Sequence, residues 1–153
     1  MATNKVPGYR QINGSFGQVW WDGELIFEVS SFSAEVTANR EKVQMAGSLD
    51  EDSKITSLSG EGTLKIKHVF TRGCKKFLDA WKSGKDPRSQ FVGKLADPDT
   101  KDSGAERIVF NNVWFNKLTL MEFETGKVLE REFPFGYTPS DVDFPDTIPV
   151  QEG

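Results

Sequence analysis

Apolar and polar residues alternate along much of the chain, which is the pattern of β-strands that bury one face. After Leu25, one face of the predicted strand carries Phe32, Ala34, Val36 and Ala38. Just before it, Asp22-Gly23 separates two short apolar runs and suits a type I′ turn, whose two central residues need a positive φ. The pattern therefore predicts an early hairpin followed by a further strand.

A second alternating run predicts a strand between Leu58 and Phe70, whose apolar face also holds Gly60, Gly62, Leu64 and Ile66. Glycine on an apolar strand face indicates that a bulky group packs close to the backbone. Trp20 and Trp21, which are adjacent and so point to opposite sides of their strand, are the candidates for that group.

One segment has helical spacing: Cys74, Phe77, Leu78 and Trp81 recur at i, i+3, i+4 and i+7. Thr71 suits the N-cap and Gly84 the C′ position. Because the stripe is apolar, the helix is expected to lie on a sheet.

The second half of the chain predicts a short strand at "SQFVGKLA" and a polar loop over 97–105. The stretch 107–137 is interpreted as two strands joined by a tight turn at 124–127, with a bulge at "NN" (residues 111–112). Strand–helix alternation is absent, which argues against a doubly wound parallel sheet. The expected fold is mainly β: an antiparallel sandwich or barrel of about six or seven strands with one flanking α-helix.

The length of 153 residues fits a single domain, 1–153, with a substantial core. Within it we expect an N-terminal arm (1–15), a long loop with weak strand edges (40–54) and a C-terminal extension (138–153). The extension contains three prolines and no periodicity, so we expect a partner to order it.

Composition changes this picture little: 37% hydrophobic and 27% charged residues are typical of a globular protein. The net charge of −4, without a basic run, argues against a protein that grips nucleic acid. No apolar run is long enough to cross a bilayer, and the first residues carry no apolar leader, so a cytoplasmic origin is expected.

Candidate chemistry is sparse. His68 is the only histidine, and without a Cys/His cluster it is interpreted as a core or edge residue rather than a metal ligand. Cys74, the single cysteine, fits a reducing compartment and is expected to be a small buried residue rather than a nucleophile. Asp97, Asp99 and Asp102 do not match the spacing of an EF-hand loop. The sequence therefore predicts no catalytic residue, no metal site and no cofactor.

The four tryptophans leave two interpretations open. Trp20, Trp21, Trp81 and Trp114 could form a sugar-stacking platform, or they could serve core packing and a protein interface. The alternative to an assembling structural protein is therefore a monomeric β-sandwich module that binds a carbohydrate or another ligand.

Several segments, in their order and spacing, resemble the tail tube proteins of PBSX-like phages and phage-derived contractile particles. These segments are "VWWDGEL", "EVTANREKVQMAG", "GEGTLKIKHV", "KSGKDP", "GAERIVFNNVWF" and "EFPFGY", which together cover about residues 17–135. The chain departs from the usual pattern after Gly47, where it reads "SLDEDSK" while relatives tend to be basic and Gly-rich, and again beyond Tyr137.

The resemblance implies a structural protein, with a fold shared with type VI secretion tubes, whose copies form homohexameric rings. Stacked rings would build the hollow inner tube of a contractile phage tail, or of a DNA-free tailocin that punctures membranes. It implies tail sheath, tape measure and baseplate proteins as partners, and DNA that passes through the lumen without specific binding. The protein would belong to a virion tail or phage-like particle assembled in the bacterial cytoplasm.

The resemblance also implies one group of contact residues, and the charge distribution of this sequence predicts a second. The segment 40–54 would bridge successive rings through Arg40, Glu41, Lys42, Gly47, Asp50, Glu51, Asp52 and Lys54. The first 21 residues carry only positive side-chain charge and the last 22 only negative charge, so in a ring the arms of neighbouring subunits should attract through Lys5, Arg10, Asp141, Asp143 and Asp146. The stretch 107–137 would be tube wall, pairing with a neighbour's sheet edge.

Overall fold

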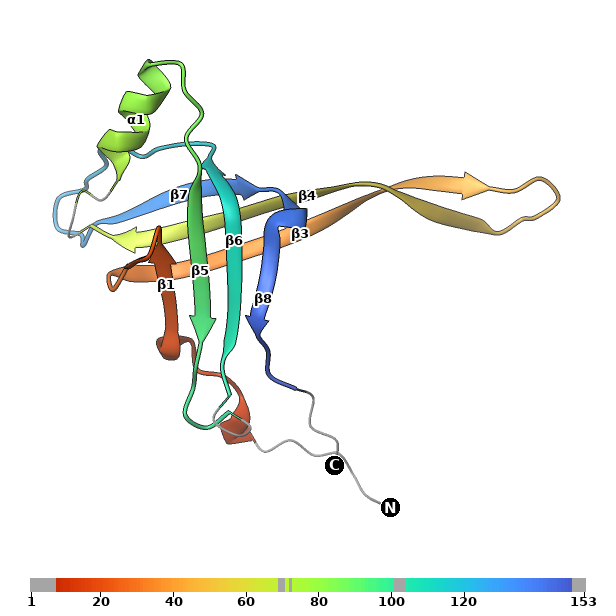
Figure 1. Cartoon of the computed structure of the whole chain (residues 1–153), viewed down its shortest axis with the longest axis horizontal. Helices are drawn as coiled ribbons and strands as arrows, with labels where there is room; N and C mark the ends of the chain where they lie inside the picture. Colours follow the sequence, from red (N-terminus) through yellow and green to blue (C-terminus); the bar gives the residue numbers. More distant parts are fainter. Residues whose placement is uncertain (1–7, 69–70, 72, 101–103, 150–153) are drawn as a thin grey trace.

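The computed structural model describes residues 8–68, 71, 73–100 and 104–149. Two antiparallel β-sheets pack face to face, and their strands cross (Figure 1). The first sheet contains β2 (Glu24–Leu25), β1 (Gly17–Trp21), β5 (Ser89–Leu95), β6 (Glu106–Phe115) and β8 (Val142–Asp146). The second contains β3 (Val29–Gln44), β4 (Glu51–Lys67) and β7 (Glu130–Tyr137). The mainly β sandwich with one flanking helix is therefore confirmed.

Strand β6 connects the two sheets. Most of it pairs with β5 and β8, whereas its last residues, Trp114 and Phe115, pair with Gly136 and Phe135 of β7. The described residues form eight strands rather than six or seven, because the short β2 and the C-terminal β8 add to those expected. Short 3-10 turns at Gly8–Arg10, Gly14–Phe16 and Pro139–Asp141 complete the described chain.

The core between the sheets is rich in aromatic side chains. The rings of Phe32 and Phe135 stack with centroids 5.6 Å apart, and Phe91 meets Phe135 edge to face at 5.1 Å. Pairs of this geometry contribute about 0.5–1.5 kcal/mol each beyond the burial of their area. At one end the helix α1 (Cys74–Lys82) places Phe77 against Trp21 and Phe115 and so closes the sandwich.

Two local predictions are confirmed by the backbone. Asp22 and Gly23 have φ values of 51° and 84°, as a type I′ turn requires. At the predicted bulge Asn112 has φ 56°, and the pairing of β5 with β6 jumps from Ser89–Val113 to Phe91–Phe110.

The glycines on the apolar face of β4 are indeed close to bulky rings, but the rings belong to different residues. A Cβ on Gly60 would collide with the ring of Tyr137, and one on Gly62 with the ring of Phe135. The expectation that Trp20 or Trp21 packs there is wrong, because β7 lies next to β4 while β1 belongs to the other sheet.

The helix begins later than predicted. Gly73 occupies the N-cap position without a side-chain hydrogen bond, and the amide of Phe77 donates to its carbonyl at 3.1 Å, so Thr71 is not the cap. The predicted end is confirmed, since Gly84 has φ 76° and its amide donates to the carbonyl of Trp81.

The predicted loop 40–54 is wrong: most of it is the outer end of a long hairpin. Strands β3 and β4 pair continuously from Val29–Ile66 to Gln44–Glu51, with bulges, and only residues 45–50 form the connection. The strands were hidden in the sequence because both faces are exposed there, so apolar and polar residues do not alternate.

The predicted hairpin over 107–137 is correct in its turn and in the outer parts of its two strands. Its turn exists, with Gly126 at φ 85° and the amide of Lys127 donating to Glu124. However, β6 ends at Phe115 and shares only two residue pairs with β7, and the intervening residues form no strand.

The C-terminal extension is also more ordered than expected. Residues Val142–Asp146 form β8, which pairs antiparallel with β6 of the same chain at Phe110, Val109 and Arg107. The expectation that a partner is needed to order this segment is therefore wrong for β8, since the edge of β6 provides the pairing.

Candidate assembly surfaces

The β3–β4 hairpin extends well beyond the sandwich (Figure 1). The boundary is Tyr137, the last residue of β7: it pairs with Gly60, and its hydroxyl donates to the carbonyl of Glu35 at 2.7 Å. Burial and the nearby Glu35 carboxylate raise the pKa of Tyr137. Past this point β3 and β4 have no third strand beside them, and we call residues 36–58 the projecting hairpin.

One face of the projecting hairpin continues the apolar face of the core. Phe32 and Ala34 pack against the core, and the next residues on that face, Val36 and Ala38, leave the body. Across the ladder, Leu58 pairs with Ala38. Val36 is 52% exposed and Leu58 is 53% exposed, so no other part of the described chain covers this apolar surface.

The structure brings all eight candidate inter-ring residues onto the projecting hairpin. Glu41 pairs with Lys54 across the ladder, and Lys42 Nζ lies 3.7 Å from Glu51 Oε1. Arg40 Nη1 donates to Ser53 Oγ at 3.3 Å. The other three, Gly47 with φ 85°, Asp50 and Asp52, lie in or beside the connection. Because these groups are exposed, such pairs stabilise the single chain little.

The arm candidates are placed differently. Lys5 lies outside the described residues, and Arg10 ends the first 3-10 turn. The carboxylate of Asp141 accepts from Asn112 Nδ2 at 3.0 Å, and that of Asp146 lies 3.5 Å from Arg107 Nε. Asp143 stands opposite Val109 in β8. These acids contact the body of their own chain, and their contact with a neighbouring subunit stays a prediction.

The residues whose side chains could take part in catalysis or metal binding have surroundings that indicate a structural role instead. Cys74 is buried, and burial raises the pKa of its thiol, although Arg131 Nη1 at 3.5 Å acts in the opposite direction. His68 is exposed at the end of β4. The carboxylate of Asp97 accepts from the amides of Asn13 and Asp99 and so holds a turn. Within the described ranges, no group of three His, Cys, Asp or Glu residues could hold a metal ion.

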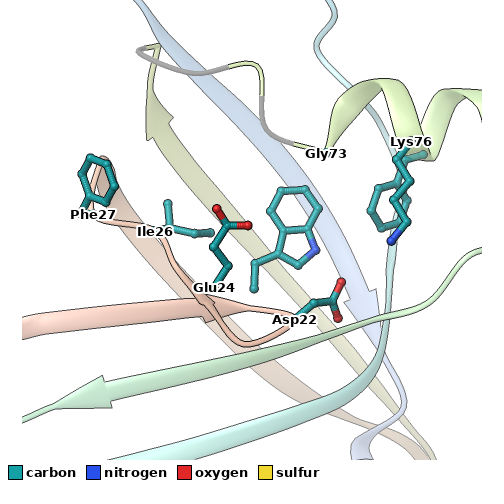
Figure 2. A pocket seen from close by; sticks show the side chains of 8 residues that line it. Asp22, Glu24, Ile26, Phe27, Gly73 and Lys76 are labelled. Atoms are coloured by element: carbon teal, nitrogen blue, oxygen red, sulfur yellow. The ribbon is translucent and has the colours of Figure 1, made fainter.

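A hollow of about 490 Å³ lies between the β1–β2 turn and the start of α1. Figure 2 shows its lining, which mixes Trp21, Ile26, Phe27 and Phe77 with the charged Asp22, Glu24 and Lys76. A groove of about 950 Å³ lies between the sheets, and its lining includes Val19, Phe32 and Ile108. Neither lining contains a histidine or a cysteine, and each mixes apolar with polar and charged side chains.

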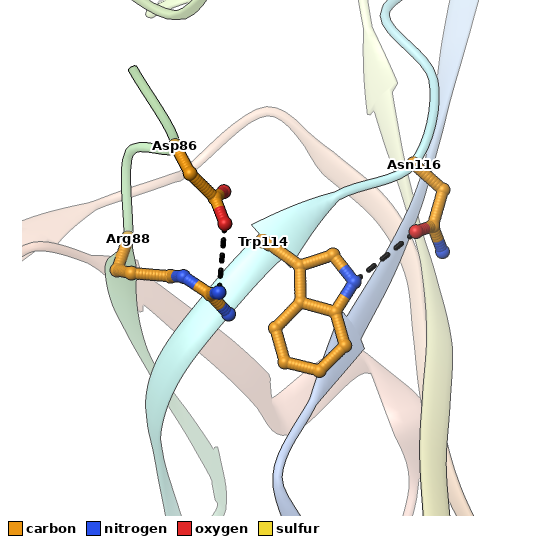
Figure 3. Close-up of polar contacts among 4 residues, drawn as sticks. All are labelled: Asp86, Arg88, Trp114 and Asn116. Atoms are coloured by element: carbon orange, nitrogen blue, oxygen red, sulfur yellow. Dashed lines mark hydrogen bonds and ion pairs between the residues drawn. The ribbon is translucent and has the colours of Figure 1, made fainter. Parts of the chain in front are cut away.

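Two of the four tryptophans, Trp21 and Trp114, are poorly placed for a stacking platform. Trp21 is buried in the core. Figure 3 shows Trp114 beside Arg88, whose guanidinium carbon lies 4.7 Å from the ring centroid and which pairs with Asp86 at 2.8 Å. The indole Nε1 donates to Asn116 Oδ1 at 3.2 Å. A sugar would have to displace the arginine to stack on this ring.

Sequence reasoning missed a second exposed apolar surface, in the segment between β6 and β7. Met121 is 79% exposed and Phe123 is 72% exposed, and Leu120 and Val128 are exposed as well. The available signal was "KLTLMEF", in which apolar residues fall on both faces of a possible strand. In the part of the chain that the structure describes, no helix is long and apolar enough to span a membrane.

Comparison with known proteins gives a consistent set of similarities. Residues 4–146 match the family described as phage tail tube protein. The phage-like element PBSX protein XkdM of Bacillus subtilis (strain 168) is 28% identical over 138 residues, which are 90% of this chain and 92% of XkdM. Two solved structures share the fold with a TM-score of 0.66. One is the tube-terminating cap of the anti-feeding prophage, at 10% identity over 96% of this chain and 95% of that one. The other is the sheath–tube complex of an extracellular contractile injection system, at 13% identity over 94% and 93%.

Proposed function

Because the chain belongs to the phage tail tube protein family, we propose that six copies close into a ring and that such rings stack into a hollow tube. The family is structural, so the chain is a tail component rather than an enzyme. In this proposal the tube is the inner tube of a contractile phage tail or phage-like particle, and it serves DNA passage or membrane puncture.

The observation that carries the proposal is the projecting hairpin. It is far longer than the fold needs, and it exposes Val36 and Leu58 on one face beside a set of charged residues. A two-stranded ribbon is marginally stable alone in water, and one that leaves the body while exposing apolar side chains is suited to contact with another molecule. We infer that it bridges to the next ring through the residues from Arg40 to Lys54.

A closed ring would also cover the open sheet edges of its subunits. Strand β3 ends the second sheet with one edge unpaired, and a long open edge in a monomer invites uncontrolled pairing. Cyclic contact between two different edges of neighbouring copies removes both edges at once. Many weak contacts are sufficient in such an assembly, because each subunit touches several neighbours.

The remaining partners follow from the tube proposal. A tail sheath outside the tube, and tape measure and baseplate proteins along it and at its end, are the expected partners. The sheath–tube complex among the similar structures supports this expectation. A chain with net charge −4 suits a lumen that lets DNA pass without holding it. The tube would be assembled in the bacterial cytoplasm.

The proposal is tested by negative-stain electron microscopy and sedimentation velocity of the purified protein across a concentration series. We expect sixfold rings and short tubes with a central channel at high concentration. A protein that stays monomeric at every concentration and binds a carbohydrate in calorimetry would overturn the proposal in favour of the binding module.

A further inference from the structure

The segment 117–123 has the sequence of a strand but does not form one. It reads "KLTLMEF", in which β-forming and apolar residues dominate. In the structure it has no sheet pairing, Leu118 is partly buried, and Met121 and Phe123 are largely exposed. A stretch of this composition is therefore left without sheet pairing between two strands.

The reason that β6 does not continue along β7 lies in β7. The amide of Asn116 donates to the carbonyl of Pro134 at 3.0 Å, but Pro134 has no N–H to return a second bond. One step further, the carbonyl of Glu132 accepts from the hydroxyl of Thr119 at 3.1 Å instead of from a backbone amide. The ladder therefore ends, although Thr119 still contacts β7.

This position makes segment 117–123 the border of the second sheet. The sheet begins with the free edge of β3, continues through β4 and β7, and ends at the segment. The two borders of this sheet differ. At one border, β3 is a complete strand of 16 residues with an open edge, and at the other, segment 117–123 has not formed a strand.

We propose that segment 117–123 becomes a strand on assembly, by pairing with the free edge of β3 in a second copy of this chain. The inference rests on the proposed ring. It adds that segment 117–123 of one copy meets β3 of the next, and that segment 117–123 forms its strand on contact. Pairing of this kind supplies backbone hydrogen bonds from the edge, while alternate side chains find cover. It also covers Met121 and Phe123, which the single chain leaves in water.

The other free edges of the described chain fit less well. Strand β2 has only two residues, too few to pair with a seven-residue segment. Strand β8 has five, and it carries Pro145 between exposed residues and acids at Asp143 and Asp146, features that discourage further pairing. The outer part of β4, residues 51–59, is open as well, but it lies on the projecting hairpin. Of the described strands, β3 alone offers a long open edge that also runs along the body, and its exposed Val36 and Val43 add apolar cover.

The direction of the backbone groups provides a specific test. Since Asn116 donates toward β7, the even-numbered amides of a continued strand face β7 and the odd-numbered amides face away. Met121→Pro removes one outward-facing donor at an exposed position. The matched control is Thr125→Pro, which places proline at the second position of the turn that ends in Lys127, before Gly126 with φ 85°.

Hydrogen exchange of the full chain, as monomer and as assembly, measures whether the strand forms. We expect amides 117–123 to exchange at least tenfold more slowly in rings than in monomers, with little change at 124–127. Met121→Pro should be folded but fail to form rings, and Thr125→Pro should form rings as wild type does. Rings in which 117–123 exchanges as fast as in the monomer, or normal rings from a folded Met121→Pro, would overturn the inference and leave the proposed function standing. If Met121→Pro is unfolded by circular dichroism, the exchange comparison in wild type decides alone.

A photo-crosslinking residue at position 123, in mixed rings of isotopically light and heavy copies, identifies the partner strand. Light–heavy crosslinks to peptides from 29–44 are expected. Crosslinks to other regions would overturn the assignment of β3. Wild-type protein that forms no assembly at all would overturn the proposed function, and this inference with it.

Discussion

The two halves of the β3–β4 hairpin have the same backbone pairing but opposite relations to the rest of the chain. Within the body, Leu64 and Ile66 of β4 are fully buried and β7 pairs alongside. Beyond Tyr137, Val36 and Leu58 stand on the same apolar face with about half of their surface exposed. Both halves have a hydrogen-bond ladder, so they differ in the burial of their side chains and not in their strand pairing.

The comparison teaches that one part of this element stabilises the fold, while the single chain leaves the other part uncovered, and it is this second part that we propose to serve assembly. Strands of 16 and 17 residues are about three times the usual length of about 5–6 residues. The inner part stabilises the fold because its side chains leave water. The outer part adds little to the fold, because its side chains stay in water until another molecule covers them.

The largest expected difference between the halves comes from deleting an apolar side chain in each. Phe135→Ala removes a fully buried ring that contacts Phe32 and Phe91, and should reduce the free energy of unfolding by about 3–5 kcal/mol. Leu58→Ala, in the projecting hairpin, should change it by less than about 0.5 kcal/mol. Urea denaturation of monomeric protein measures both, and equal losses would contradict the division.

Glycine substitutions give a smaller contrast of the same kind. A Cβ on Gly62 would meet the ring of Phe135, so Gly62→Ala should destabilise the monomer by about 1–3 kcal/mol. At Gly47 a Cβ has open space, but φ is 85°, so Gly47→Ala should cost only about 1 kcal/mol. Thermal unfolding compares the two, and the interpretation fails if Gly47→Ala is the more harmful change.

The boundary residue Tyr137 should show a pH effect that the projecting hairpin lacks. Its pKa is raised in the folded state, so the neutral phenol is favoured by folding, and this stability is complete below the unfolded pKa of about 10. It is lost as pH rises through the folded pKa. Tyr137→Phe should cost about 1 kcal/mol at neutral pH, through the lost bond to Glu35, and should weaken the alkaline destabilisation. If stability falls with rising pH in Tyr137→Phe as it does in wild type, Tyr137 is not the source of the alkaline destabilisation.

The smallest effect on the monomer is expected from the charges of the projecting hairpin. Lys42 and Glu51 are exposed and 3.7 Å apart, so Lys42→Ala should change the free energy of unfolding by less than about 0.5 kcal/mol. Its effect should appear in tube length by electron microscopy, most clearly at low salt. A large loss of monomer stability would show that the pair serves the fold instead.

The sequence predicted those parts of the fold in which burial imposes a pattern. The type I′ turn at Asp22-Gly23, the bulge at Asn112 and the helix end at Gly84 each need a backbone conformation that few residues adopt. The apolar face around Leu64 and Ile66 alternates because one side of β4 is buried.

The remaining elements could not be predicted, because they lie outside the core and burial imposes no alternation of apolar and polar residues on them. The outer end of the hairpin is exposed on both faces, so its strands resembled a polar loop. Strand β8 has only Val142 partly buried, and its pairing depends on the edge of β6, which is distant in sequence. The segment 117–123 shows the opposite case, because its sequence favours a strand that the single chain does not complete.

The central claim, that the projecting hairpin serves assembly and not folding, is tested by shortening it. Replacing residues 41–54 with Asn-Gly joins Arg40 to Ile55, a pair already opposite in the ladder, through a two-residue turn. The account predicts a monomer whose free energy of unfolding differs from wild type by less than about 1 kcal/mol, and single rings without tubes in electron micrographs. Tubes of normal length from this folded variant would contradict it.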